Sequence, residues 1–352
     1  MLKGLLRSER LLALQQALHN QELILIEELW NAPKALVAAL AQQTTGKHNL
    51  ILTGASQEEV RLFHDFALFS DRPVIDFPSW ETLPSESVPP SPDIVGERYQ
   101  VLKKLLHSAE PHIILTSLQA CLQKLIPPSV FQSLSLTLKP GQSPSFEHVI
   151  QQLLTMGYQR RPIASDKGEF AVRGGIIDLF PLSSPDPFRL EFWGDDLESI
   201  RIYDPIGQKS VRPVEQVDIC PGDEMELLNQ QTLHSSLFDY LGPQTLIIFD
   251  DLLALEDRYA SLTSMGGKSK AFSSIEEFLD QLIPFQKILL TQRPIEELSD
   301  IQTHDSKGKS YYSQQTVFHD LSFEMFNREW RVKRWRHPFN TITGYLFAQE
   351  ER

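Results

Sequence analysis

GEFAVRGGIIDLFPLSSPDPFRLEFWGDDLESIRIYDPIGQKSVR, residues 168–212, is the stretch around which this chain is organised. Its apolar runs are separated by Gly-Gly, Ser-Ser-Pro-Asp-Pro and Gly-Asp-Asp, a pattern typical of antiparallel strands joined by tight turns. Within 188–193, apolar residues alternate with Arg189, a glutamate and Trp193, so one face of this strand is expected to be buried. We therefore expect Arg173, Arg189 and Trp193 to share one open surface.

Composition is that of a globular protein with more than one domain. The chain has 352 residues, of which 41% are hydrophobic and 22% charged, so two or three domains are expected at roughly 100–200 residues each. No run approaches the ~18 apolar residues of a membrane span. The first eight residues become polar too soon for a signal peptide. We expect a cytoplasmic protein.

Metal, disulfide and acid–base sites are not indicated by the sequence. Cys121 and Cys220 are the only cysteines and are far apart, while the ten histidines are scattered. No disulfide framework, thiolate metal site or other metal-ligand spacing is therefore expected. The net charge of −13 opposes broad affinity for nucleic acid. If DNA is involved, another partner is expected to hold it.

The first third of the chain has the alternating pattern of a parallel α/β sheet. Apolar periodicity predicts helices, short apolar runs predict buried strands, and together they form a βαβ unit. The predicted helices cover 8–19, 32–44, 57–69 and 96–108, and the predicted strands cover 49–53, 73–77 and 112–116. This half of the chain looks like a nucleotide-hydrolase domain.

A phosphate-binding loop is missing from this α/β half. Such a loop needs Gly-x-x-x-x-Gly-Lys-Ser/Thr between the first strand and its helix, so that backbone N–H groups and the lysine meet the phosphates. The segment 44–48 precedes a strand instead of following one, and 266–270 follows a helix. We predict that this chain neither binds nor hydrolyses ATP.

A second, α+β domain is predicted to begin near Pro127. It contains a strand over 134–138, a helix through Met156 with Ser145 as its N-cap, and then the meander. Further on, an apolar strand over 245–249 ends in Asp250-Asp251. This pair resembles a Walker B end, which holds Mg²⁺ and polarises the attacking water. The alternative is a strand end that caps the next helix.

The long ordered motifs in 168–212 resemble those of the transcription-repair coupling factor family, whose N-terminal module is similar to the excision-repair subunit UvrB. Likeness extends to 80–84 and 245–251 and covers most of 50–260. It implies an α/β fold: a degenerate P-loop helicase-like parallel sheet with an inserted small α+β domain. The implied domains are 1–126 (UvrB domain 1a-like), 127–215 (the UvrA-binding domain) and 216–352 (a domain 1b-like region with a C-terminal linker).

The resemblance also implies a function. Such a module recruits the subunit UvrA to an RNA polymerase stalled at DNA damage, and the lost phosphate loop falls near 30–34. ATP and Mg²⁺ would serve only a C-terminal translocase beyond this chain, and RNA polymerase and DNA would be bound by such further parts. We expect the chain to be the N-terminal piece of a longer protein. The alternative is an ATP-dependent enzyme like UvrB, which Asp250-Asp251 favours, but no room remains after Pro92 for the UvrB hairpin that probes DNA.

By the resemblance, Arg173, Arg189 and Trp193 match positions linked to UvrA binding in the family. The residues supply a separate reason, because guanidiniums pair bidentately with carboxylates and an exposed aromatic can anchor a partner. In the alternative, Arg189 pairs with Glu191 or Asp178 inside the sheet.

A basic run near the C-terminus is a candidate nucleic-acid contact. Arg331, Lys333, Arg334 and Arg336 lie among two tryptophans, a mixture that can bind phosphate and stack bases. The same alternation suits an edge strand with solvated charges. We expect at most weak, salt-sensitive DNA binding from this run.

Overall fold

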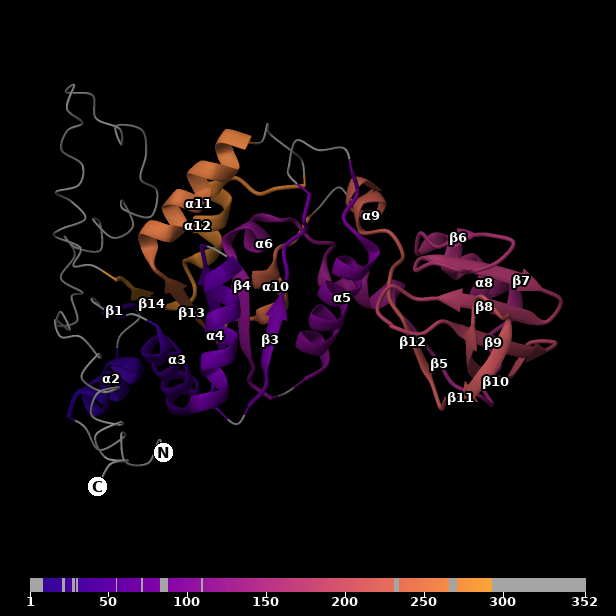
Figure 1. The fold of residues 1–352 in the computed structure, drawn as a ribbon, viewed down its shortest axis with the longest axis horizontal. Helices are drawn as coiled ribbons and strands as arrows, with labels where there is room; N and C mark the ends of the chain where they lie inside the picture. The colour runs from indigo at the N-terminus through magenta and orange to yellow at the C-terminus, as the bar shows by residue number, and fades with distance from the viewer. Residues whose placement is uncertain are drawn as a thin grey trace.

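The computed structural model describes residues 9–20, 23–26, 29, 31–54, 56–70, 72–82, 88–108, 110–230, 234–265 and 271–292. These residues form a parallel sheet and a separate, mainly antiparallel sheet, together with helices (Figure 1). The predicted α/β class is therefore confirmed.

The parallel sheet has the strand order β1-β14-β13-β2-β4-β3. Its strands are β1 (Leu23–Ile26), β2 (His48–Thr53), β3 (Val74–Phe77), β4 (Ile113–Ser117), β13 (Thr245–Asp250) and β14 (Gln286–Leu290). Every neighbouring pair is parallel, so the carboxyl ends of all these strands lie at one edge. β13 is buried at every position, as expected for a parallel strand covered on both faces. The sheet thus joins strands from both ends of the described chain, and the second sheet lies between them in the sequence.

Helices cover both faces of this sheet. One apolar cluster joins the sheet to α2 (Glu9–Asn20), α3 (Ala32–Thr45) and α4 (Ser56–Phe69). The other cluster contains α5 (Pro92–His107), α6 (Leu118–Leu122), α7 (Pro128–Leu134), α9 (Glu224–Gln230), α10 (Leu237–Leu241), α11 (Leu252–Met265) and α12 (Ile275–Leu282). Strands β1 and β14 were not predicted from the sequence.

The inserted domain lies at the far end of the molecule, beyond α5 (Figure 1). Its sheet has the order β11-β10-β9-β8-β7-β6 and is antiparallel except for the β6–β7 pair. The strands are β6 (Gln159–Arg160), β7 (Glu169–Arg173), β8 (Ile176–Phe180), β9 (Phe188–Trp193), β10 (Asp196–Asp204) and β11 (Lys209–Pro213), with β5 (Leu136–Leu138) and β12 (Val217–Ile219) forming a separate pair.

The helix α8 (Phe146–Thr155) covers one face of this sheet and shares its apolar core. Ser145 stands at the N-cap as predicted, but its side chain makes no capping hydrogen bond. Instead, the carboxylate of Asp195 accepts a hydrogen bond from the Phe146 backbone N–H at 2.8 Å. The turn after β9 therefore fixes the start of the helix, which ties α8 to the sheet that it covers.

The inserted domain is seated directly on α5. A Cβ atom on Gly96 would lie 1.9 Å from the backbone oxygen of Leu182, so only glycine allows this close approach. Polar contacts surround it: Gln100 Nε2 donates to Ser183 O at 2.7 Å, Lys103 pairs with Asp218 at 2.8 Å, and Lys167 pairs with Asp93 at 2.6 Å. Main-chain packing and ion pairs together hold the two domains against each other.

A buried ionic cluster fixes the place where the chain returns to the larger domain. Arg98 of α5 is fully buried, and its guanidinium lies 3.6 Å from the carboxylate of Glu224, the first residue of α9. That carboxylate also accepts a hydrogen bond from the Trp80 indole at 2.8 Å. Arg98 donates in addition to the Pro78 backbone oxygen at 2.8 Å and to Gln123 Oε1 at 3.0 Å. Burial raises the pKa of the Glu224 carboxyl, while the charge of Arg98 opposes that shift.

Candidate protein-binding surface

The face of the inserted sheet opposite α8 carries the three residues singled out from the sequence. In β9 the apolar residues are buried and the alternating positions are more exposed, as predicted. The strand register pairs Arg189 with Asp178 on β8 and with Arg201 on β10, and it pairs Arg173 with Ile176. Because paired residues point to the same side of a sheet, all these side chains belong to one face. We call it the open face.

Arg189 is held within the sheet by Asp178. Its Nε and Nη2 atoms donate to the two carboxylate oxygens of Asp178 at 2.7 and 2.9 Å, a bidentate pair. Asp178 is only 2% exposed, and the guanidinium carbon of Arg189 lies 5.2 Å from the centre of the Tyr203 ring. The hydrogen bond to Asp178 raises the pKa of Arg189. Of the two partners considered from the sequence, Asp178 is therefore the one with which Arg189 forms its ion pair.

Arg173 is exposed, and both it and Arg189 donate hydrogen bonds to Gln208. Arg173 Nη2 donates to the Pro162 backbone oxygen at 2.9 Å, and its Nη1 donates to Gln208 Oε1 at 3.2 Å. Arg189 Nη1 donates to the backbone oxygen of the same Gln208 at 3.3 Å. Gln208 was not predicted as a site residue, because it is distant from both arginines in sequence and lies in a turn without a recognisable motif.

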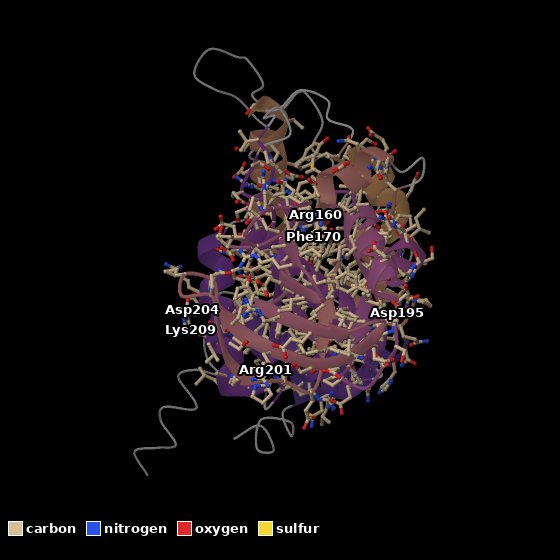
Figure 2. The ribbon with its side chains drawn as sticks, turned by 90° about the vertical axis from the view of Figure 1, so that its right-hand side faces the viewer. Arg160, Phe170, Asp195, Arg201, Asp204 and Lys209 are labelled. Carbon is tan, nitrogen blue, oxygen red and sulfur yellow. The ribbon has the colours of Figure 1, made fainter. Side chains whose placement is uncertain are left out.

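Trp193 lies at the other end of β9, four residues from Arg189. At ~3.3 Å per strand residue the two Cα atoms are about 13 Å apart. The side chain of Trp193 is 77% exposed, and the left-handed Gly194 (φ 61°) begins the turn that follows. Figure 2 shows Asp195 of this turn at one end of strand β10, and Asp204 and Lys209, which flank the next turn, at the other end. On the open face, Arg189 and Trp193 therefore lie toward opposite ends of β9.

Asp250, the first residue of the Walker B-like pair, makes a buried ion pair. It ends β13, and its Oδ1 lies 2.6 Å from Nζ of Lys34, with both side chains 2% exposed. Lys34 belongs to the first turn of α3, which follows β1. Here the two charges neutralise each other. No separate role was predicted for Lys34, although it is the last residue of the segment 30–34 near which the lost loop was expected.

Asp251 follows in a left-handed conformation (φ 58°), and its backbone oxygen accepts a hydrogen bond from Leu255 N–H of α11. The segment 44–48 contains the end of α3, where left-handed Gly46 is the C-cap. The segment 266–270 and the basic run Arg331, Lys333, Arg334 and Arg336 lie outside the described residues.

The part of the chain that the structure describes has neither a candidate metal site nor a candidate membrane span. Within it, no group of three or more His, Cys, Asp or Glu side chains is placed to hold a metal ion. Within it, too, every helix is too short or too polar to cross a membrane.

Comparison with known proteins gives consistent matches. Residues 136–225 match the family model described as the UvrB interaction domain. The transcription-repair-coupling factor of Escherichia coli (strain K12) is 32% identical over 201 residues, which is 57% of this chain and 17% of that relative. The Haemophilus influenzae factor is 32% identical over 194 residues, 54% of this chain and 17% of the relative. The Myxococcus xanthus factor is 29% identical over 232 residues, 64% of this chain and 19% of the relative.

The matches thus span less than a fifth of the length of these curated relatives. The region that matches the family model contains the whole antiparallel sheet and all three residues of the open face that were singled out from the sequence. These matches support a module similar to part of the transcription-repair-coupling factors, with a UvrB interaction domain over residues 136–225.

Proposed function

We propose that the chain is a protein-recognition module that recruits UvrA through the open face of the inserted domain. The observation that carries this proposal is the pair of arginines tied together at Gln208, on the same face as a tryptophan that is 77% exposed. The name of the matching family model, the UvrB interaction domain, supports it.

The arginines keep hydrogen-bond capacity for a partner. A guanidinium has five N–H donors, and Arg189 uses Nε, Nη2 and Nη1 once each within the domain. One hydrogen on each terminal nitrogen remains, and these two can meet a carboxylate end-on. Arg173 likewise uses each terminal nitrogen once. Acidic groups on UvrA suit this face, with Trp193 as the apolar anchor.

For the larger domain we propose a degenerate P-loop helicase-like fold that does not hydrolyse ATP. The parallel sheet and the Lys34–Asp250 contact at its carboxyl edge support this reading, because the lysine meets the aspartate directly instead of reaching a phosphate. The UvrB-like enzyme is the competing function. Saturable Mg-ATP binding in calorimetry, abolished by Asp250→Asn, would favour it.

In the whole protein, parts of the family beyond this module would use ATP and Mg²⁺, bind RNA polymerase and bind DNA. The module would then bring UvrA to a polymerase stalled at damage during transcription-coupled nucleotide excision repair. We place this activity in the cytoplasm.

Binding of the chain to purified UvrA tests the proposal by calorimetry or surface plasmon resonance. Arg173→Ala, Arg189→Ala and Trp193→Ala should each weaken binding by about 2 kcal/mol, or roughly 30-fold. Arg61→Ala, on the exposed surface of α4 in the larger domain, is the matched control and should bind like the parent.

Arg189→Ala also leaves Asp178 buried without its cation, so it can unfold the domain. Arg189→Lys is therefore a necessary second variant, since lysine keeps the charge but cannot form the bidentate pair. Circular dichroism separates lost binding from lost folding. Folded variants at all three positions that bind UvrA as tightly as the parent would show that the open face is not the binding surface.

A further inference from the structure

Gln208 occupies a tightly held turn between β10 and β11. Asp204 accepts hydrogen bonds from the backbone N–H groups of Ile206 and Gly207, both at 3.0 Å. Gln208 itself has a φ of 52°, a left-handed conformation that residues other than glycine and asparagine rarely adopt. Such an outlier in an exposed turn is a reason to look for a role of the side chain.

Every polar group of the Gln208 side chain is engaged. Its Nε2 donates to the Pro205 backbone oxygen at 2.5 Å, which leaves Oε1 facing the Nη1 donor of Arg173 at 3.2 Å. The donor role at one end and the acceptor role at the other fix the orientation of the amide. The backbone oxygen of Gln208 accepts a hydrogen bond from Nη1 of Arg189. One residue therefore contacts both guanidinium groups, beside the pair that Asp178 forms with Arg189.

Two cations placed close together repel each other, and exposed arginines lose side-chain entropy when a partner orders them. A neutral amide that holds one guanidinium, next to a carbonyl that holds the other, reduces both costs before a partner arrives. Glutamine fits this task because its amide reaches Arg173 without neutralising the positive charge that an acidic partner needs.

We propose that Gln208 is a positioning residue of the UvrA-binding surface, which spaces Arg173 and Arg189 to receive one acidic segment of UvrA. This inference rests on the proposed function. It assigns Gln208 an effect on affinity that acts through Arg173.

Two substitutions of Gln208 separate positioning from folding. Gln208→Asn keeps an amide and tolerates the left-handed backbone but is one methylene too short to reach Arg173. Gln208→Gly relieves the backbone and removes the amide altogether. We expect both variants to bind UvrA about tenfold more weakly, whereas the melting temperature of Gln208→Gly stays equal to or above that of the parent. Gln216→Asn, at an exposed glutamine of the same domain, is the control and should bind unchanged.

A double-mutant cycle with Arg173→Ala identifies the route of the effect. If Gln208 acts by positioning Arg173, Gln208→Asn should cause little further loss once Arg173 is alanine. Additive losses would mean that Gln208 contacts UvrA itself, and this would overturn the positioning role. Parent-like binding by both Gln208 variants, beside weakened Arg173→Ala, would overturn it while leaving the proposed function intact. Parent-like binding by Arg173→Ala as well would also overturn the positioning role, whereas the proposed function fails only if the variants at Arg173, Arg189 and Trp193 all bind like the parent.

Discussion

Replacing Glu224 by glutamine tests the buried ionic cluster, the feature that fixes the return of the chain from the inserted domain. Glutamine keeps an oxygen acceptor for the Trp80 indole but removes the negative charge 3.6 Å from Arg98. Arg98 is fully buried, so its charge is then left without a counterion. Breaking one partner out of a buried ion pair costs about 3–5 kcal/mol.

We expect a loss near the lower end of that range, about 3 kcal/mol, because the oxygens of Pro78 and Gln123 still accept hydrogen bonds from Arg98. The folded-to-unfolded ratio should thus fall on the order of a hundredfold. Urea unfolding followed by circular dichroism measures this change. Glu226→Gln is the matched control, since it makes the same chemical change at an exposed position of the same helix α9.

The reasoning also predicts the behaviour of a double variant. Removing both charges with Arg98→Met and Glu224→Gln should cost less than the sum of the two single losses, because neither charge is then left buried alone. A Glu224→Gln protein that unfolds at the same urea concentration as the parent would refute the reasoning. It would mean that water reaches Arg98 and that the cluster does not hold α9.

Three further predictions concern the larger domain and its contact with the inserted domain. Burial lowers the pKa of His48 below its ordinary value, and His48 Nδ1 accepts the backbone N–H of His112, so the folded protein binds fewer protons than the unfolded chain. The free energy of unfolding should therefore fall as the pH drops through 6.5, and urea midpoints of His48→Asn should show a shallower decline. Gly96→Ala should lower the free energy of unfolding by about 1–3 kcal/mol, because the added Cβ has no room beside the Leu182 carbonyl. A parent-like urea midpoint would mean that α5 and the Leu182 backbone can move apart without loss of stability. Asp250→Asn should destabilise the domain by about 3 kcal/mol without changing the response to Mg-ATP, as thermal melts with and without nucleotide will show.

Much of the fold follows from local sequence patterns. The turn residues of 168–212 place the strands of the meander, and the alternation in 188–193 correctly separates the buried face from the open face. The four-residue strand β1 was missed because so short an apolar run carries no period of its own. Its strand character depends on pairing with β14, more than 250 residues later.

The site could be predicted only in part, for a related reason. Arg189 could be assigned to the open face from alternation, but Asp178 and Glu191 were equally available as partners until the register placed Asp178 opposite it. Gln208 carries no sequence signal, because its role depends on an unusual backbone angle and on a distant arginine. The contact between Lys34 and Asp250 likewise depends on how α3 and β13 meet at one edge of the sheet.

The close approach of Gly96 to Leu182 has a mechanical consequence. A domain joined by a flexible tether would swing freely and pass little torque to its neighbour. Here the backbone of one domain presses on the backbone of the other, with ion pairs around the contact. The inserted sheet and the parallel sheet should therefore turn together as one lever arm. A protein bound at the open face would therefore keep a fixed orientation relative to the larger domain. A force applied to that protein would be transmitted to the parallel sheet.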